Sequence, residues 1–425
     1  MHSKKNWLIV ITCCLSIFVI SFFGTAQAES LAELQEKAVN NRKLVEKYRV
    51  SVQKGEEDVK ISQSRFSPSF DINYTANSLD NDTTFENSEN SYFTASLSYN
   101  IFSGFKHRYD LKSAELIKKS KDYELESMIQ GIKYLVAVRY LDIYGKKNSL
   151  KVAEDEYNLL KKRHEDTESR HKVGLIRRND LLKIKVELDD AEQGLKKARA
   201  ELTKSTNLLE FETDSDIDAG SLNFNEFKNL PKVQDFSFYE SLMLEKKNEI
   251  KALETVLHAT RYSAKSAESA FYPSVDASAG YKRAGDNYLL GVDSDNDDEI
   301  RVQLSLNMNI FDGSRKYAAV RKAGMEVKSV EYDLYELRND LATELENILL
   351  DYGVALKNLK VAESSISQAE ENLRITDISF KEGVETAADV LDAIFYLSRA
   401  KYNFINARNE VFLYYYKLVR ITDDF

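Results

Sequence analysis

The sequence predicts a mixed α/β membrane protein, built mostly from long α-helices together with four amphipathic β-strands. Charged residues make up 30% of the 425 residues, prolines number only 3 and the mean hydropathy is −0.45, a profile typical of long helices with much solvated surface. Four segments also alternate strictly between apolar and polar residues, as strands with one apolar face do. Compact globular domains are therefore not expected.

Residues 1–28 have the composition of an export signal peptide. A basic start precedes an apolar run from Trp7 to Phe23, and the small residues of Ala26–Ala28 supply a cleavage site. The alternative is an uncleaved membrane anchor. Both cysteines, Cys13 and Cys14, lie in this segment, so the exported chain is expected to have no disulfide and no thiolate metal site.

The chemistry of the remaining chain is predicted to be that of an acidic, non-enzymatic protein. The whole sequence has a formal net charge of −10, which becomes −12 without Lys4 and Lys5 of the signal peptide. Nucleic acid is therefore a poor partner, because its phosphates repel acidic surfaces. No phosphate-binding glycine loop and no nucleophile–base pairing stands out. We therefore expect no cofactor, no bound metal and no catalytic residue.

The chain is predicted to be an internal duplication. The sequence NIFSG beginning at Asn100 recurs as NIFDG at Asn309, and KVAE beginning at Lys151 recurs at Lys360 after the same 209 residues. Upstream, Pro68 and Pro273 are 205 residues apart. A constant register over about a hundred residues is hard to obtain by chance. We divide the chain into a signal peptide, a first repeat, a polar linker and a second repeat: 1–28, 29–213, 214–235 and 236–425.

Each repeat is predicted to contain two strands. The first strand of each pair follows Pro68 or Pro273, because proline fits the first residue of a strand, where no ladder donor is needed. Strands of about ten residues can cross a bilayer when tilted, and aromatic residues gather near their ends. An ordinary half-buried sheet is the alternative. The alternation is seen in Phe70–Thr75, Phe93–Ile101, Val275–Lys282 and Ile300–Ile310.

Everything else is predicted to be helical. Proline is absent from two long segments, which at 1.5 Å per residue and about 67 residues would each form a helix of roughly 100 Å. The chain then turns at Gly174 or Gly383 and returns through shorter helices, and a further helix precedes each strand pair. Antiparallel hairpins of this kind predict coiled-coil packing. The predicted helices are 30–65, 106–172, 180–212, 236–270, 314–380 and 389–422.

Gly104 and Gly313 stand where a strand is expected to become a long helix, because glycine lets the backbone turn sharply. Four strands cannot close a barrel, and an open sheet edge cannot exist in lipid. Other copies must therefore close it. Two copies would enclose a barrel filled by side chains, whereas twelve strands from a homotrimer leave room for a pore. The polar inward faces favour the trimer, set in outer-membrane lipid.

The sequence resembles the TolC-like outer membrane factors, also called outer membrane efflux proteins. The resemblance covers essentially the whole exported chain and is most specific at two turns, VGLIRRNDLL from Val173 and EGVETAADVLDA from Glu382. It implies a β-barrel through the outer membrane of a Gram-negative bacterium and an α-helical tunnel, or α-barrel, across the periplasm. Such a duct joins an inner-membrane transporter and a periplasmic adaptor (a membrane fusion protein) in efflux or type I secretion of small molecules or proteins.

The resemblance also implies the candidate site. Asp389 and Asp392, the carboxylates of the DVLDA motif, are expected to form acidic rings at the periplasmic entrance. Six carboxylates around one axis would select cations and repel anions. The alternative is that Asp389 merely N-caps the return helix. The residues expected to contact the adaptor are those of the two turns: Gly174, Leu175, Gly383 and Val384.

One departure from the family's pattern concerns the gate. Phe380 and Glu385 stand where the family often carries Tyr and Arg before the acidic pair. Phenylalanine cannot donate a hydrogen bond, which removes the donor of the usual latch to Asp180. We expect Glu385 to pair instead with Arg177 or Arg178 of the facing turn.

Two other functions remain open. A periplasmic coiled-coil adaptor needs one helical hairpin flanked by β-rich halves, whereas this chain predicts two hairpins and amphipathic strands. A trimeric surface anchor is disfavoured because nearly all of the helix lies between membrane-type strands. The cargo has no signature in the sequence, because a duct makes few cargo-specific contacts.

Overall fold

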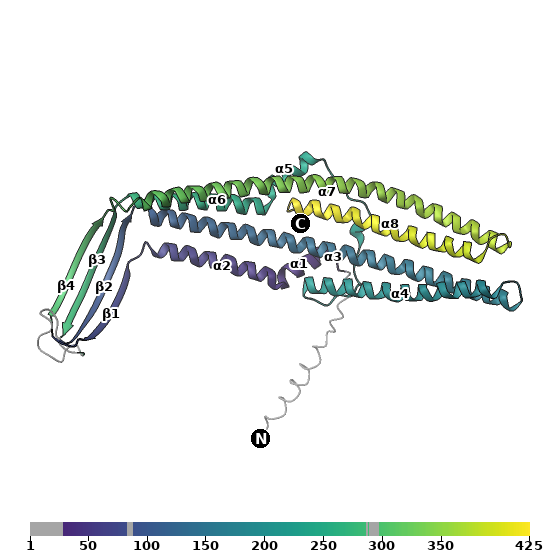
Figure 1. The fold of residues 1–425 in the computed structure, drawn as a ribbon, viewed down its shortest axis with the longest axis horizontal. Helices are drawn as coiled ribbons and strands as arrows, with labels where there is room; N and C mark the ends of the chain where they lie inside the picture. Colours follow the sequence, from purple (N-terminus) through teal and green to yellow (C-terminus); the bar gives the residue numbers. More distant parts are fainter. Residues whose placement is uncertain (1–28, 83–87, 286–287, 289–296) are drawn as a thin grey trace, which may run out of the picture.

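The computed structural model describes residues 29–82, 88–285, 288 and 297–425, so the predicted signal peptide lies outside the described residues. The molecule is long and narrow, with a β-sheet at one end and two helical hairpin turns at the other (Figure 1). The first half contains α1 (Leu31–Asn41), α2 (Lys43–Ser64), β1 (Ser69–Ser78), β2 (Glu89–Ser103), α3 (Lys106–Lys172) and α4 (Arg178–Thr213). The second half contains α5 (Phe236–Lys246), α6 (Asn248–Glu268), β3 (Ser274–Gly285), β4 (Asp297–Asn307), α7 (Arg315–Lys381) and α8 (Ala387–Ile421). Short 3-10 turns are η1 (Asn225–Phe227) and η2 (Ser269–Phe271).

The two long helices begin and end within one residue of the prediction, and α3 and α7 contain 67 residues each. The helices that precede the strands differ from it. Each was expected as a single helix and is instead broken once, at Arg42 and at Lys247, where ψ is 120° and 113°. Neither residue is a helix breaker by itself, so the cause is tertiary and is described below.

The four strands form one antiparallel sheet in the order β1-β2-β3-β4, and the β2–β3 pair joins the two halves of the chain. The register places apolar residues side by side across all four strands. Leu97 lies between Phe70 and Ala279, and Val302 lies beyond Ala279. Because partners in an antiparallel pair share a face, one face of the sheet is apolar over most of its length, as predicted, and the paired Arg283 and Asp298 lie on it near the loops.

The fourth strand is shorter than predicted. The alternation of residues continues to Ile310, but β4 ends at Asn307, opposite Ser274. Pro273 precedes Ser274 and has no N–H to extend the ladder. The carbonyl of Asn309 is bound instead by the Lys316 ammonium at 2.7 Å.

The helices lie side by side in one layer. Near the sheet their order is α2, α3, α6, α7, and toward the hairpin turns it is α4, α3, α8, α7 (Figure 1). Two short helices placed end to end thus run beside each long helix, as predicted. The row has two free edges, one formed by α2 and α4 and the other by α7.

The segment 214–235, predicted to be a polar linker, buries several apolar side chains. Ile217, Leu222 and Phe227 are buried in the same core as Tyr140 of α3. Phe227 is 1% exposed, and the Arg408 guanidinium donates to its carbonyl at 2.6 Å. This connector therefore belongs to the core and ties α3 to α8.

Candidate functional site at the hairpin tips

Each helical hairpin turns on a glycine in the left-handed region. Gly174 has φ +79° and Gly383 has φ +77°, a conformation that glycine adopts without steric cost. In both turns the amide of the next residue donates to the carbonyl five residues earlier, at 3.0 and 2.9 Å. These next residues, Leu175 and Val384, are 76% and 80% exposed. The far end of the molecule thus presents two apolar side chains to solvent.

Thr386, and not Asp389, is the N-cap of α8. The Thr386 hydroxyl accepts from the Asp389 amide at 3.3 Å, and the Asp389 carboxylate accepts from the Thr386 amide at 2.8 Å, which is a capping box. The alternative that Asp389 itself is the N-cap is therefore wrong. The hydrogen bonds from Thr386 lower the pKa of Asp389, whereas a hydrogen bond with Asp389 raises the pKa of Glu385.

The structure brings Asp392 close to the other hairpin. A groove of about 470 Å³ lies between the first turns of α4 and α8, and it is lined by Asn179 and Lys183 on one side and Asp392 on the other. Asp180 lies half-buried in the first turn of α4, where its amide donates to the carbonyl of Arg177 at 3.1 Å. The two tips are therefore neighbours within one chain.

Phe380 fills a space between the hairpins instead of forming a polar latch. Its ring packs on an apolar cluster of buried residues that includes Leu160 and Val390. The guanidinium groups of Arg163 and Arg170 lie 5.4 and 5.9 Å from the ring centroid, within the range of cation–π attraction. Phe380 therefore holds the last turns of α3 and α7 together by packing.

An ion pair between Arg163 of α3 and Asp377 of α7 reinforces this contact. Burial alone would raise the pKa of Asp377, but hydrogen bonds and charge from Arg163 and Lys381 outweigh it and lower the pKa. Sequence reasoning missed this pair. The two residues are 214 positions apart, and the only sequence signal is that each lies on a predicted long helix near its turn.

The predicted pairing of Glu385 with an arginine is not formed within one chain. Arg177 is the N-cap residue of α4 and Arg178 is its first residue; both are exposed. In the part of the chain that the structure describes, neither forms an ion pair with Glu385, which interacts with Asp389 instead.

At the opposite end of the long helices, both joints use glycine as predicted. Gly104 and Gly313 have φ +63° and +69°, and the residue after each also has positive φ. Pro68 and Pro273 directly precede β1 and β3. Each joint thus places two consecutive left-handed residues between a strand and a long helix.

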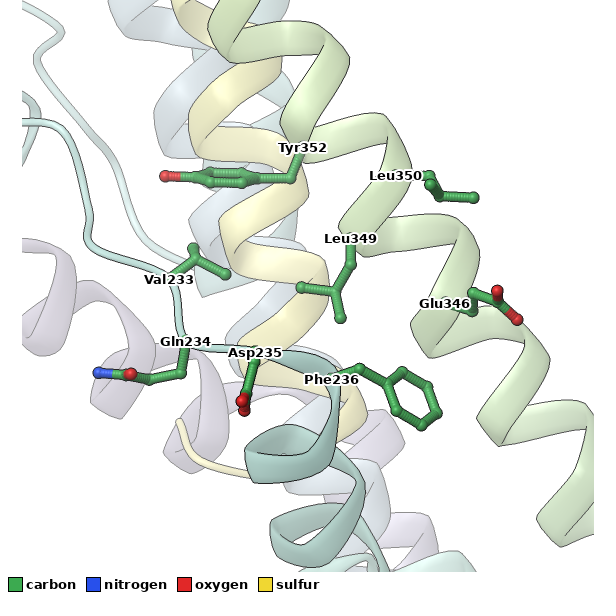
Figure 2. Close-up of a pocket in the computed structure, with 8 residues that line it drawn as sticks. All are labelled: Val233, Gln234, Asp235, Phe236, Glu346, Leu349, Leu350 and Tyr352. Carbon is green, nitrogen blue, oxygen red and sulfur yellow. The ribbon is translucent and has the colours of Figure 1, made fainter.

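A cavity of about 550 Å³ lies halfway along α7, against the end of the connector (Figure 2). Leu349 and Phe236 line it, and the Tyr352 hydroxyl donates to the carbonyl of Pro231 at 2.7 Å. Leu349 is the repeat equivalent of Tyr140, so the cavity is the counterpart of the site that the connector fills beside α3. It contains none of the predicted gate residues.

Across the described ranges, no helix combines the length and apolar content that crossing a bilayer requires. The same residues contain no group of three or more His, Cys, Asp or Glu side chains placed to hold a metal ion.

A sheet with one apolar face, joined to paired helical hairpins with carboxylates at their far end, defines a channel-forming class of outer-membrane protein. The chain belongs to the outer membrane efflux protein family, whose model matches residues 34–211 and 241–421. The two matched segments lie in the two halves of the chain. Family membership places the protein in the outer membrane as an efflux channel component with a helical tunnel in the periplasm.

Individual relatives are distant but cover the whole fold. Outer membrane protein TolC of Vibrio cholerae is 22% identical over 410 residues, which are 94% of this chain and 92% of the relative. Outer membrane efflux protein BepC of Brucella suis is 19% identical over 406 residues, 93% of this chain and 86% of the relative.

Solved structures show the same fold. A crystal structure of CusC matches with a TM-score of 0.79 at 14% identity, covering 92% of this chain and 91% of that one. VceC of Vibrio cholerae matches with a TM-score of 0.78 at 17% identity, covering 92% and 95%. The open state of the MtrE channel of Neisseria gonorrhoeae matches at 0.74 and 15% identity, covering 92% and 88%.

Proposed function

We propose that three copies of this chain form one duct, with a 12-stranded β-barrel in the outer membrane and a closed ring of helices in the periplasm. The observation that carries the proposal is the open sheet. Its apolar face includes Ile300, Val302, Leu304 and Leu306 of β4, which are 68–81% exposed in a single chain. Such a face suits lipid, but the unpaired edges β1 and β4 do not.

Closure by other copies removes the free edges of the sheet and those of the helical row at the same time. An edge-to-edge contact pairs β4 of one copy with β1 of the next, and the free helical edges α7 and α2–α4 meet in the same way. Twelve strands leave an open lumen, whereas eight would be filled by side chains. The polar face of the sheet, with residues such as Ser98, Ser278 and Gln303, then lines that lumen.

The hairpin tips form the periplasmic entrance of this duct. Asp389 and Asp392 are exposed in the first turns of α8, and three copies bring six such carboxylates around the axis. Leu175 and Val384 project beyond them and form the contact with a periplasmic adaptor, which connects the duct to an inner-membrane transporter. Small molecules or secreted proteins are the proposed cargo.

The entrance is held shut by charge pairing between copies. Glu385 already interacts with Asp389 in its own chain, so the ring concentrates negative charge that needs cations close by. Arg177 and Arg178 of the adjacent tip supply them. The Arg163–Asp377 pair and the Phe380 contact keep each chain's own hairpins together while this latch opens or closes.

The carboxylate ring is tested by Asp389→Asn combined with Asp392→Asn in planar bilayers. We expect weaker block by trivalent cations, because neutral amides no longer attract them. Glu165→Gln with Glu168→Gln removes as many charges from α3 near the same tip and should leave the block unchanged. Unchanged block in the Asp389 and Asp392 variant would remove the ring from this position.

A further inference from the structure

The two repeats form side-chain contacts at equivalent positions. Ser205 of α4 donates to the carboxylate of Asp142 of α3 at 2.6 Å. Tyr414 of α8 lies near Asp351 of α7, and burial together with this carboxylate raises the pKa of Tyr414. The second pair lies 209 residues after the first, and the two KVAE motifs are separated by the same distance. Contacts within the first hairpin therefore predict contacts within the second.

The helices that precede the strands superpose at the shorter repeat offset. Arg42 donates to the carbonyl of Phe211 at the end of α4 at 2.9 Å, and Lys247 donates to the carbonyl of Arg420 at the end of α8 at 3.0 Å. Arg42 and Lys247 are separated by the same offset as the prolines before β1 and β3. Each position on α6 thus has an equivalent on α2 at this offset.

Within one chain the halves meet along a seam between α3 and α6. Buried residues of α6 recur along it at a spacing of seven, at Ala252, Ala259 and Ser266. From one hydrogen-bonded pair to the next along the seam, the residue number on α3 increases by as much as the residue number on α6 decreases. A single antiparallel register therefore extends along the whole seam. The pairs are Asp110–Ser266, Ser113–Ser263 and Ser127–Glu249.

The free edges of the row are the repeats of this seam. In a closed ring α7 of one copy meets α2 of the next, as α3 meets α6 within the chain. Adding 209 to a residue number on α3 gives the equivalent position on α7. Subtracting 205 from a residue number on α6 gives the equivalent position on α2. The pair Ser113–Ser263 then becomes Lys322 on α7 and Asp58 on α2. The same register places two further pairs of opposite charge face to face, Glu326 with Lys54 and Asp333 with Lys47.

These six side chains have the properties that such contacts require. All are exposed in the single chain. Within the described residues none of them forms an ion pair, although other charged residues of α2 do, as in the pairs Glu46–Arg49 and Glu57–Lys60. Along α7 the signs run plus, minus, minus, and along the facing residues of α2 they run minus, plus, plus. In this register all three facing pairs therefore have opposite charges.

We propose that α7 of each copy docks on α2 of the next in the register of the α3–α6 seam, with Lys322 paired to Asp58, Glu326 to Lys54 and Asp333 to Lys47. The partner is a second copy of this chain, and the inference rests on the proposed trimer. Hydrogen bonds made by serine hydroxyls connect α3 and α6 within one chain. Ion pairs at equivalent positions select the neighbouring copy and fix its height, because opposite charges attract in one register and like charges repel in others.

Disulfide trapping tests the register. In a chain whose Cys13 and Cys14 are replaced by Ser, Lys322→Cys with Asp58→Cys should give covalently linked trimers on oxidation. Ser113→Cys with Ser263→Cys is the matched control and should cross-link within one chain, leaving a monomer band. Lys322→Cys with Lys60→Cys, whose second cysteine lies on another face of α2, should not cross-link.

Charge exchange provides a second measurement that needs no cysteine. Lys322→Glu should raise the concentration at which trimers in detergent half-dissociate by about tenfold, because a modest loss is repeated in three equivalent interfaces. Adding Asp58→Lys should restore most of the affinity, and 1 M salt should reduce the difference between the variants because it screens exposed charges.

The outcomes separate the two proposals. Trimers that form normally but show neither the Lys322–Asp58 cross-link nor rescue by charge exchange would overturn the register and leave the duct intact. A chain that remains monomeric at every concentration in detergent and in bilayers would overturn the trimer itself, and the register with it.

Discussion

Gly104 and Gly313 occupy equivalent joints, yet the two glycines face unequal surroundings. Both have positive φ, +63° and +69°. A Cβ on Gly104 would lie 2.6 Å from the carbonyl oxygen of Ser269 and 2.8 Å from Cβ of Tyr272, whereas a Cβ on Gly313 would meet nothing within 4 Å in the single chain. Gly104 is thus required by backbone conformation and by space, and Gly313 by conformation.

This difference predicts unequal costs for the same substitution. Gly313→Ala should destabilise the protein by about 1–2 kcal/mol, the cost of the left-handed conformation for a residue with a Cβ. Gly104→Ala should cost more, because the carbonyl of Ser269 must also move. The measurement is the midpoint of thermal unfolding of the detergent-solubilised protein, followed by far-ultraviolet circular dichroism. Equal losses for the two variants would contradict the steric part of the explanation.

At the candidate site, the sequence could predict single residues but not their long-range partners. The turns at Gly174 and Gly383 and the exposure of Asp392 follow from local rules for glycine and for helix starts. The Arg163–Asp377 pair does not, because its members lie on different helices and their neighbourhood is decided by how the hairpins pack. The alternative that Asp389 caps α8 was wrong for a local reason, since a threonine three residues before an aspartate satisfies the capping box better than the aspartate alone.

The broken helices show how an element can depart from its own propensities. Lys247 interrupts α5 and α6, and its ammonium pairs with Asp423 at 3.0 Å, with the two side chains 3% and 1% exposed. Burial lowers the pKa of Lys247, and the neighbouring Arg420 lowers it further. The break lets the buried Lys247 ammonium bind the end of α8. This contact connects the start of α6 to the end of α8, and the two helices lie end to end.

The neighbouring lysine supplies a matched comparison. Lys247→Met should cost about 3 kcal/mol of unfolding free energy, near the low end for breaking a buried pair, because Arg420 still binds Asp423. Lys246 pairs with Asp424, and these side chains are 43% and 53% exposed, so Lys246→Met should cost about 0–1 kcal/mol. Chemical denaturation of both variants in detergent checks the difference. A loss below about 1 kcal/mol for Lys247→Met would show that the break has another cause.

Helix lengths could be predicted where sequence composition alone decides them. The helix α3 extends from joint to turn because no proline or cluster of turn residues interrupts it, and its bounds agree with the prediction. The breaks at Arg42 and Lys247 could not be predicted in this way, because each depends on a carbonyl far away in the chain. The early end of β4 depends in the same way on the proline before its partner strand.

On the scale of the whole molecule, about 100 Å of helix separates the sheet from the charged tips. The proposed latch at this end acts between copies, so three equivalent contacts control one entrance. Arg177→Glu with Arg178→Glu should raise single-channel conductance by opening the entrance, and adding Glu385→Arg should partly close it again. Arg374→Glu, which alters an exposed arginine paired along α7, should leave conductance unchanged.

Acid should weaken the same latch. Within one chain the neighbouring Asp389 raises the pKa of Glu385, and the hydrogen bonds from Thr386 lower the pKa of Asp389. An arginine of the next copy would lower the pKa of Glu385 in the latched state, and protonation of Glu385 removes the charge that this arginine binds. The latch contribution is therefore present at neutral pH and is lost as the pH falls through the pKa of Glu385. Wild-type conductance in the double arginine variant, together with a flat pH profile, would place the latch elsewhere.

The connector between the halves affects how strongly assembly depends on protein concentration. In the proposed ring, three of the six lateral seams lie within single chains and are closed before the chains meet. Assembly is then third order in protein concentration, and a tenfold dilution lowers the ratio of rings to free chains about a hundredfold. Were the halves separate molecules, assembly would be sixth order, and the same dilution would lower that ratio about a hundred-thousandfold. The connector thus sets how far the protein can be diluted while it still closes its ring.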